Sequence, residues 1–207
     1  MKKLKFNHFL NLFLGIQIIF GNQLFAQSSQ SSKIIDQISL SEEDIALFKE
    51  NSQRKINEFT DYIVIIADKT QPASKRDMAE REALKLFHKD ATMETSSLKS
   101  DGTASIKQRP MAEYLYRLKT LPYLKVVIKF YDICYVTDFV RAEDGSYRAS
   151  ATIFQDFTGY SGDKIVYHDI TKKEIQIIIN LVEDEFFNEK SWQVFLGDVK
   201  VTETKLK

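Results

Sequence analysis

Apolar side chains recur at every second position through much of the second half of the chain. The clearest run is Ile175, Ile177, Ile179 and Leu181, and residues 147–157 alternate in the same way. This spacing places the apolar side chains of an extended chain on one face, so it predicts strands that bury one side of a sheet. Such a sheet needs a second layer to cover its apolar face.

Turn sequences divide this half into consecutive strands. Asp144-Gly145 predicts a hairpin at residues 142–146, and residues 159–164 predict a second turn. Residues 124–139 contain no breaker and predict one long strand.

The last strand carries a change of register. Its apolar positions are Trp192, Val194 and Leu196 before Gly197, and they shift by one residue after it. An extra residue in one strand has this effect, so the sequence predicts a β-bulge at Gly197-Asp198.

The first half of the chain supplies helices for the covering layer. Apolar residues recur at helical spacing through residues 41–70, and Ser74 with Asp77 has the spacing of a helix-capping pair. A short third helix is predicted after Pro110. Because helices precede consecutive antiparallel strands, the predicted fold class is α+β, with N-terminal helices packed on a curved antiparallel sheet.

The N-terminus has the features of an export signal. Lys2, Lys3 and Lys5 precede an apolar run at residues 9–20, which is too short and too interrupted for a membrane span. Small Ala26 then marks a cleavage site; the alternative is an uncleaved signal anchor. The predicted organisation is a signal peptide at 1–26, a disordered leader at 27–40 and a single domain at 41–207, located in the periplasm or secreted.

The charge, the cysteine content and the motifs of the chain exclude several kinds of partner, cross-link and site. Removal of the signal leaves 26 basic and 29 acidic residues, so there is no electrostatic reason to expect nucleic acid or an anionic membrane as a partner. Cys134 is the only cysteine, so no internal disulfide can form. No glycine-rich phosphate loop, nucleophile motif or cluster of metal ligands occurs, and neither a metal nor a cofactor is expected.

The segment at residues 83–93, Ala-Leu-Lys-Leu-Phe-His-Lys-Asp-Ala-Thr-Met, resembles the junction of helix two and strand one in the nuclear transport factor 2-like superfamily. The short helix after Pro110 and the opening of the last strand at Lys190-Ser191-Trp192 are also similar. That superfamily includes the SnoaL-like and ketosteroid-isomerase-like folds. The resemblance implies that sheet and helices enclose a cone-shaped pocket; residues 158–173 depart from it as an extra hairpin or sheet extension.

Two residues are candidates for the acid–base chemistry that enzymes of this superfamily perform. Asp132 interrupts an apolar strand, and a carboxylate that faces a core has a raised pKa and can act as a general base. His168 is the second candidate, although it cannot form a dyad with Asp169 because neighbours on a strand point to opposite faces. For both, the alternative is a solvated side chain.

A ligand pocket in this fold would draw its polar groups from the strands and helices around it. Tyr62, Tyr114 and Tyr131 are candidates for hydroxyl groups in such a pocket, and Asp156 is a candidate carboxylate. The alternative for each tyrosine is a core position with a solvated hydroxyl.

Three functions remain open. The first is a non-catalytic exported domain that binds a small apolar molecule or an envelope protein, which predicts a pocket lined only by apolar and hydroxyl groups. The second is a SnoaL-like lyase, isomerase or hydrolase that uses Asp132 as general base. The third is a scaffold subunit that forms a homodimer through its outer sheet face, which predicts a filled interior.

Overall fold

The computed structural model describes residues 39–98, 103–131, 136–184 and 189–207. Residues 43–207 form one compact unit. The predicted signal peptide and most of the predicted leader lie outside the described residues. No described helix is both long enough and apolar enough to cross a membrane.

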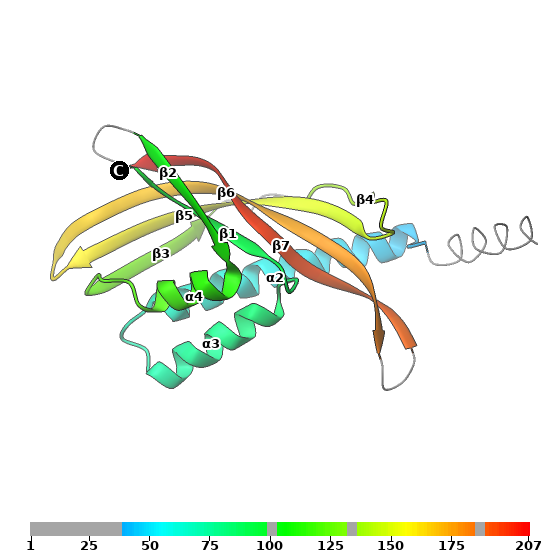
Figure 1. Ribbon diagram of the computed structural model, residues 1–207, viewed down its shortest axis with the longest axis horizontal. Coiled ribbons are helices and arrows are strands. Elements are labelled where there is room, and N and C mark those ends of the chain that lie inside the picture. Colours follow the sequence, from blue (N-terminus) through cyan, green and yellow to red (C-terminus); the bar gives the residue numbers. More distant parts are fainter. Residues whose placement is uncertain (1–38, 99–102, 132–135, 185–188) are drawn as a thin grey trace, which may run out of the picture. The chain divides into compact units, whose positions relative to one another are not determined.

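Three helices and seven strands make up the described part of the chain, and it is of mixed α and β type as the sequence predicts (Figure 1). In chain order they are α2 (Glu42–Ala67), α3 (Ala73–Lys85), β1 (Thr92–Leu98), β2 (Ala104–Pro110), α4 (Met111–Lys119), β3 (Lys125–Tyr131), β4 (Val140–Arg141), β5 (Tyr147–Ser161), β6 (Lys164–Asp184) and β7 (Glu189–Leu206).

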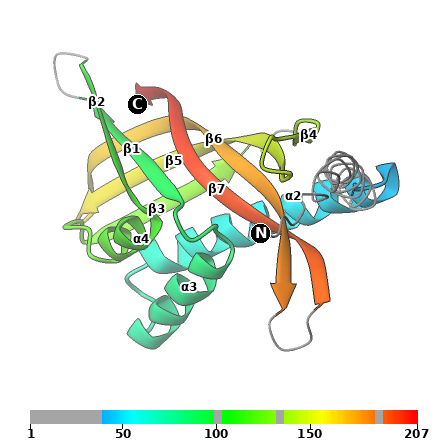
Figure 2. The ribbon, with the colours of Figure 1, turned by 45° about the vertical axis from the view of Figure 1, so that its right-hand side comes forward.

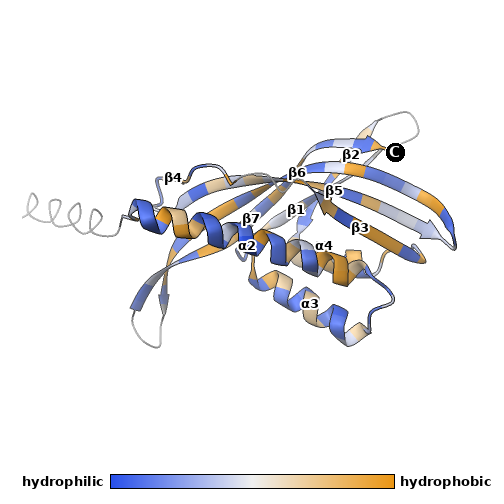
Figure 3. Ribbon diagram, turned by 180° about the vertical axis from the view of Figure 1, so that it is seen from behind, coloured by the Kyte–Doolittle hydropathy of each residue, from blue (hydrophilic) through white to orange (hydrophobic). Residues whose placement is uncertain are grey.

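The helices cover one face of the sheet, whose long strands bend around them (Figures 1 and 2). The C-terminal half of α2 is its more apolar half (Figure 3), and it buries Phe59, Ile63 and Ile66 almost completely. Phe59 meets Phe87 edge to face, with 4.8 Å between ring centroids. Burial of an apolar helix stripe against a sheet is the main favourable term in such a fold.

The start of α3 differs from the prediction. Pro72 occupies the N-cap position, and no side chain caps the helix there. Asp77 instead pairs with Lys119 of α4 at 2.7 Å. The partner that decides the role of Asp77 is 42 residues away in the chain, so the local capping pattern did not identify it.

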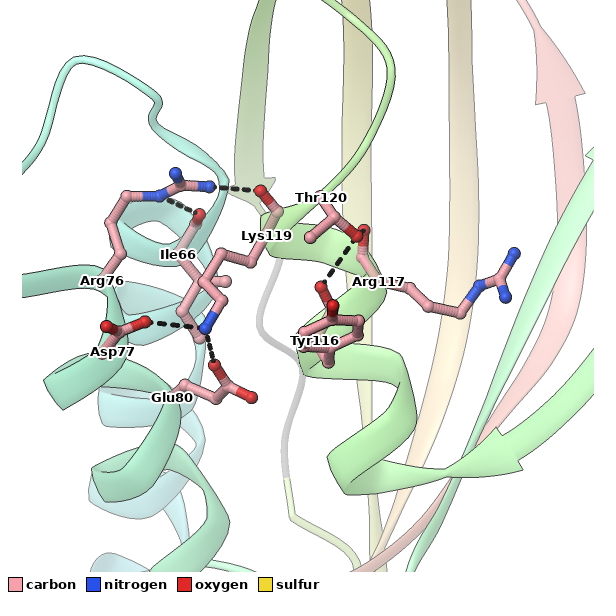
Figure 4. A network of polar contacts seen from close by, with 8 residues as sticks. All are labelled: Ile66, Arg76, Asp77, Glu80, Tyr116, Arg117, Lys119 and Thr120. Atoms are coloured by element: carbon pink, nitrogen blue, oxygen red, sulfur yellow. Dashed lines mark hydrogen bonds and ion pairs between the residues drawn. The ribbon is translucent and has the colours of Figure 1, made fainter. Parts of the chain in front are cut away.

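Arg76 links three helices through backbone atoms (Figure 4). Its Nε donates to the carbonyl of Ile66 in α2 at 2.8 Å, and its Nη2 donates to the carbonyl of Lys119 in α4 at 2.6 Å. The Lys119 side chain in turn forms ion pairs with Asp77 and Glu80 of α3. Because the last carbonyls of a helix have no intrahelical partner, one guanidinium from α3 satisfies the ends of two other helices.

The sheet order is β2-β1-β7-β6-β5-β3, with β4 paired to β5. All pairings are antiparallel except β1 with β7, which is parallel at Met93 and Val199. The fully antiparallel sheet predicted from sequence is therefore wrong at this one place. A short turn makes two consecutive strands antiparallel. β1 and β7 are the first and last strands in the chain, so no such turn sets their relative direction.

Two long strands, β5 and β6, replace the shorter ones that the sequence predicts. The hairpin at residues 142–146 is confirmed, and Gly145 has a φ of +82° that favours glycine. The next turn is narrower than predicted: β5 continues to Ser161, and Gly162 adopts a φ of +61°. From there β6 runs without interruption through Lys172 and Lys173.

The bulge in β7 is confirmed. Ile175 pairs with Val199 and Ile177 pairs with Leu196, so Gly197 and Asp198 of β7 both lie opposite Gln176, and β7 has one extra residue there. The Asp198 carboxylate accepts hydrogen bonds from the backbone N and the Oγ1 of Thr92, at 2.9 and 2.8 Å. The bulge therefore anchors the first residue of β1 beside β7.

The strand predicted at residues 124–139 is shorter than expected. It ends as β3 at Tyr131, and residues 136–139 are not in a strand. Asp132 and Cys134 lie outside the described residues. Val136, the next described residue after Tyr131, is buried.

Candidate functional site

A cavity of about 290 Å³ lies between α4 and the inner, helix-covered face of the sheet. Its lining comes from α4 and the loop after it, from β1 and β2, and from β5 and β6. The lining residues are Thr95, Ser96, Ser97, Arg109, Tyr114, Arg117, Leu118, Leu121, Tyr123, Gln155, Phe157, Tyr167, Asp169, Thr171 and Lys173.

Strand β6 forms the polar floor of the cavity. Its odd-numbered side chains face inward, and Ile175, Ile177 and Ile179 on that face are fully buried. The same face continues toward residue 167 as Lys173, Thr171 and Asp169, which are also 4% exposed or less. One buried strand face thus changes from isoleucine to polar side chains without reaching solvent, and it does so where the cavity begins.

Asp169 lies at one end of this floor. Burial raises the pKa of its carboxyl above the usual value, and the hydrogen bond from the Tyr167 hydroxyl, at 2.6 Å, opposes part of that rise. The paired hydroxyl and carboxyl form a hydrogen-bonding end for a bound molecule.

Lys173 lies at the other end of the floor. Its Nζ is 3.4 Å from the carbonyl of Glu94 and 3.6 Å from the Sδ of Met93, and it lies 5.7 Å from the centroid of the Tyr114 ring. Both polar contacts are long for an ammonium donor. Burial lowers the pKa of Lys173 to about 8, although the charges of Asp169 and Glu94 act in the opposite direction.

The remaining walls are aromatic and aliphatic. Tyr123 meets Phe157 edge to face at 5.8 Å, and Phe157 meets Tyr167 in the same way at 5.9 Å. Burial raises the pKa of Tyr114 in α4 and that of Tyr123. Each of these tyrosines therefore stays a neutral phenol at physiological pH.

Two arginines stand where the cavity approaches the surface. Arg109 donates to Glu113 at 3.1 Å and to the Oγ1 of Thr95 at 3.2 Å. Arg117 lies 3.8 Å from the same carboxylate, and its side chain is 59% exposed. Because Glu113 offsets part of both charges, this end of the cavity is polar without being strongly cationic.

The structure separates the residues that the sequence singled out. Tyr114 lines the cavity, whereas Tyr62, Tyr131 and Asp156 are not among its lining residues. Tyr131 stacks on Phe154, with 5.6 Å between ring centroids, on the outer face of the sheet. Asp132, proposed as a general base, lies outside the described residues.

His168 and Asp156 do meet, but away from the cavity. The His168 Nε2 lies 3.0 Å from an Asp156 oxygen, and Lys207 approaches the same carboxylate at 3.7 Å. Both residues have even numbers on β6 and β5, so they lie on the outer face, opposite the inward Asp169. The prediction that His168 and Asp169 point to opposite faces is confirmed.

Sequence reasoning missed Asp169, Thr171 and Lys173 as a group. The sequence did contain an indication of their burial: all three have odd numbers, like Ile175 and Ile177, and in one continuous strand they share the face of those isoleucines. The sequence instead predicted an extra hairpin or sheet extension at residues 158–173, and none of the three was named as a candidate site residue. The charged floor also makes the prediction of a pocket with only apolar and hydroxyl groups wrong.

Within the described residues, no group of three or more histidine, cysteine or acidic side chains is arranged to hold a metal ion. The chain matches no protein-family model and none of the curated proteins with which it was compared. The cavity is therefore the feature of this chain that bears on its function.

Proposed function

We propose that this domain binds a small organic molecule in the inner-face cavity and holds it without chemical turnover. The observation that carries the proposal is the change on the inner face of β6 from buried isoleucines to Asp169, Thr171 and Lys173. The buried side-chain nitrogen and oxygen atoms of the described residues all have hydrogen-bond partners within the protein, so this polar face does not need a ligand to be stable. Its polar groups nevertheless border the cavity, where they can form further hydrogen bonds with a bound molecule.

The walls indicate the kind of molecule. Leu118, Leu121 and Phe157 favour an apolar, flat body, and the floor favours polar groups at the ends of that body. The sequence predicted an apolar ligand, whereas this lining favours an amphipathic one, with an apolar body and polar ends. A volume of about 290 Å³ suits a single-ring compound.

The binding experiment uses two probes of this shape, 4-hydroxybenzyl alcohol and 4-methylphenol. We expect saturation-transfer NMR to detect both with the wild-type protein and to lose both signals with Thr171→Phe, because the larger ring fills the cavity. Thr171→Leu should reduce the signals in part, which keeps the test informative if Thr171→Phe does not fold. Ile170→Phe is the matched control on the outer face of the same strand and should leave binding intact. Binding that survives Thr171→Phe in a folded protein would place the ligand elsewhere.

We also propose that the domain shares the cone-shaped fold of the nuclear transport factor 2-like superfamily. The order of two helices, a hairpin, a short helix and long strands supports this assignment, as does a cavity on the helix-covered face. The extended β5–β6 hairpin lies at the predicted departure from that pattern. A crystal structure with a ligand in the cavity would test both the shape and the occupant.

Export is part of the same proposal, because the lysines and apolar run at the N-terminus have the pattern of a signal peptide. Expression of the whole chain in a Gram-negative host should give a periplasmic or secreted protein whose mass corresponds to a start at Gln27. A full-length cytoplasmic product would contradict export while leaving the cavity proposal intact. Envelope-protein binding and homodimer formation stay predictions.

A further inference from the structure

Lys173 is a buried amine that ligand binding alone does not require. It is 3% exposed and lies on the cavity floor. The groups that face it are Glu94 from β1, Tyr114 from α4 and, further along its own strand, Asp169.

From this placement we infer that Lys173 captures a ligand carbonyl as a reversible imine, and that the ligand class is a small aldehyde or ketone with a hydroxyl group at its far end. The inference rests on the proposed binding function and specifies its ligand. Asp169 and Tyr167, at the opposite end of the floor, are the hydrogen-bonding partners for that hydroxyl.

The reaction balances without a further reactant. The Nζ lone pair of the neutral amine attacks the carbonyl carbon, and the electrons of the C=O π bond move to the oxygen. The two amine protons end on that oxygen, which leaves as water when the C=N bond forms. Hydrolysis by water reverses each step, so the ligand is held but neither oxidised nor reduced.

Two physical features favour this chemistry at Lys173 over other lysines. Imine formation needs the neutral amine, and a pKa of about 8 gives a neutral fraction at pH 7.5 about two hundredfold above that of a solvated lysine. The buried floor also limits access of bulk water to the product. Lys172, the next residue, lies on the outer face with its Nζ 6.0 Å from the Phe154 ring centroid, and it does not line the cavity.

The experiment traps the imine with borohydride. Wild-type protein is incubated with 4-hydroxybenzaldehyde, reduced with sodium cyanoborohydride and mapped by peptide mass spectrometry. We expect the hydroxybenzyl adduct on Lys173 to exceed that on Lys172 at least about tenfold, because Lys173 lines the cavity that holds the aldehyde and Lys172 does not. Lys173→Met should lose the major adduct, Lys172→Met should keep it, and excess 4-hydroxybenzyl alcohol should suppress it.

Binding of 4-hydroxybenzyl alcohol distinguishes failure of the imine proposal from failure of the proposed binding function. If it binds in the cavity but the aldehyde labels surface lysines evenly or labels none, the imine is wrong and the binding function stands. If neither probe enters the cavity, the proposed function fails and the inference with it. Peptide mapping of the wild-type protein gives the answer even if Lys173→Met does not fold.

Discussion

Burial of the Lys173 amine makes the stability of this protein depend on pH. Its pKa in the folded state is about 8, against 10.5 for an unperturbed lysine. Between these values the unfolded chain binds more protons than the folded one, so stability rises with pH through that window. Below pH 8 the folded protein carries the full cost of a charged buried amine.

Lys173→Met is therefore expected to stabilise the protein at pH 7, by about 1–3 kcal/mol. The gain should shrink as pH rises from 8 to 10.5, because the wild-type amine is then neutral in the folded state. Urea unfolding of both proteins across pH 6.5–10.5 measures the difference. Lys172→Met, on the outer face, is the control for the loss of one positive charge, and a difference for Lys173→Met that stays constant with pH would refute the burial argument.

Gly159 holds open the space that Tyr123 occupies. A Cβ atom at this position would lie 2.7 Å from the Cδ1 of Tyr123 and 2.9 Å from its Cγ, so the ring and not merely its tip must move. Gly159→Ala should cost about 1–3 kcal/mol, the usual range for overpacking, and should weaken binding in the cavity that Tyr123 lines.

A double-mutant cycle checks the cause. In the Tyr123→Ala background the clash is gone, so Gly159→Ala should cost clearly less free energy of unfolding than it does in the wild type. Equal costs in both backgrounds would mean that the glycine is needed for its backbone and not for the room it leaves.

At the level of elements, Arg76 determines how α4 lies beside α2. Its guanidinium is hydrogen-bonded to one carbonyl at the end of each helix, and a planar fork can reach both at once. Arg76→Ala should destabilise the protein by about 1–2 kcal/mol, since hydrogen bonds from charged donors lie near this range and the side chain is only partly buried. Chemical denaturation gives the value.

Arg76→Lys provides the control, because it keeps the charge but offers a single nitrogen. If geometry is what matters, the lysine variant should recover less than half of the loss. Full recovery would show that charge near the helix ends is sufficient. Because α4 carries Tyr114 and Leu118 into the cavity, Arg76→Ala should also weaken probe binding in proportion to the disorder of that helix.

The sequence predicted those elements whose patterns are local. Alternation identified the strands, Asp144-Gly145 identified a turn, and the parity change at Gly197 identified the bulge, since each is encoded within a few residues. The parallel contact of β1 with β7 has no local code, because it joins Met93 to Val199. Asp77 and Arg76 likewise have partners that only the packed helices bring near.

The cavity floor was hidden for a different reason. Lysine and aspartate in a strand usually mark a solvated position, so neither Asp169 nor Lys173 was predicted to line a pocket. Their burial depends on the length of β6 and on the cover that α4 provides, and both are tertiary features. Tyr114 was found because it is apolar enough to fit the helix pattern and polar enough to suggest a pocket.

At the scale of the whole domain, the sheet is continuous from β2 to β3, and every strand of that order except β2 contributes buried side chains to the core. The first helix packs against strands that close the chain, and β7 lies between β1 and β6. Elements from both ends of the domain therefore share one core. If the helices unfolded alone, the apolar face of the sheet would lose its cover.

This arrangement predicts one cooperative unfolding transition for residues 39–207. Differential scanning calorimetry should give a calorimetric enthalpy equal to the van't Hoff enthalpy, as expected when domains of this size unfold without populated intermediates. The midpoint should be the same with and without reductant, because Cys134 has no second cysteine in the chain with which to form an internal disulfide. Two separate transitions would mean that the helices and the sheet do not share one core. A midpoint that falls on reduction would indicate a disulfide between two copies of the chain, and its dependence on protein concentration would distinguish that case.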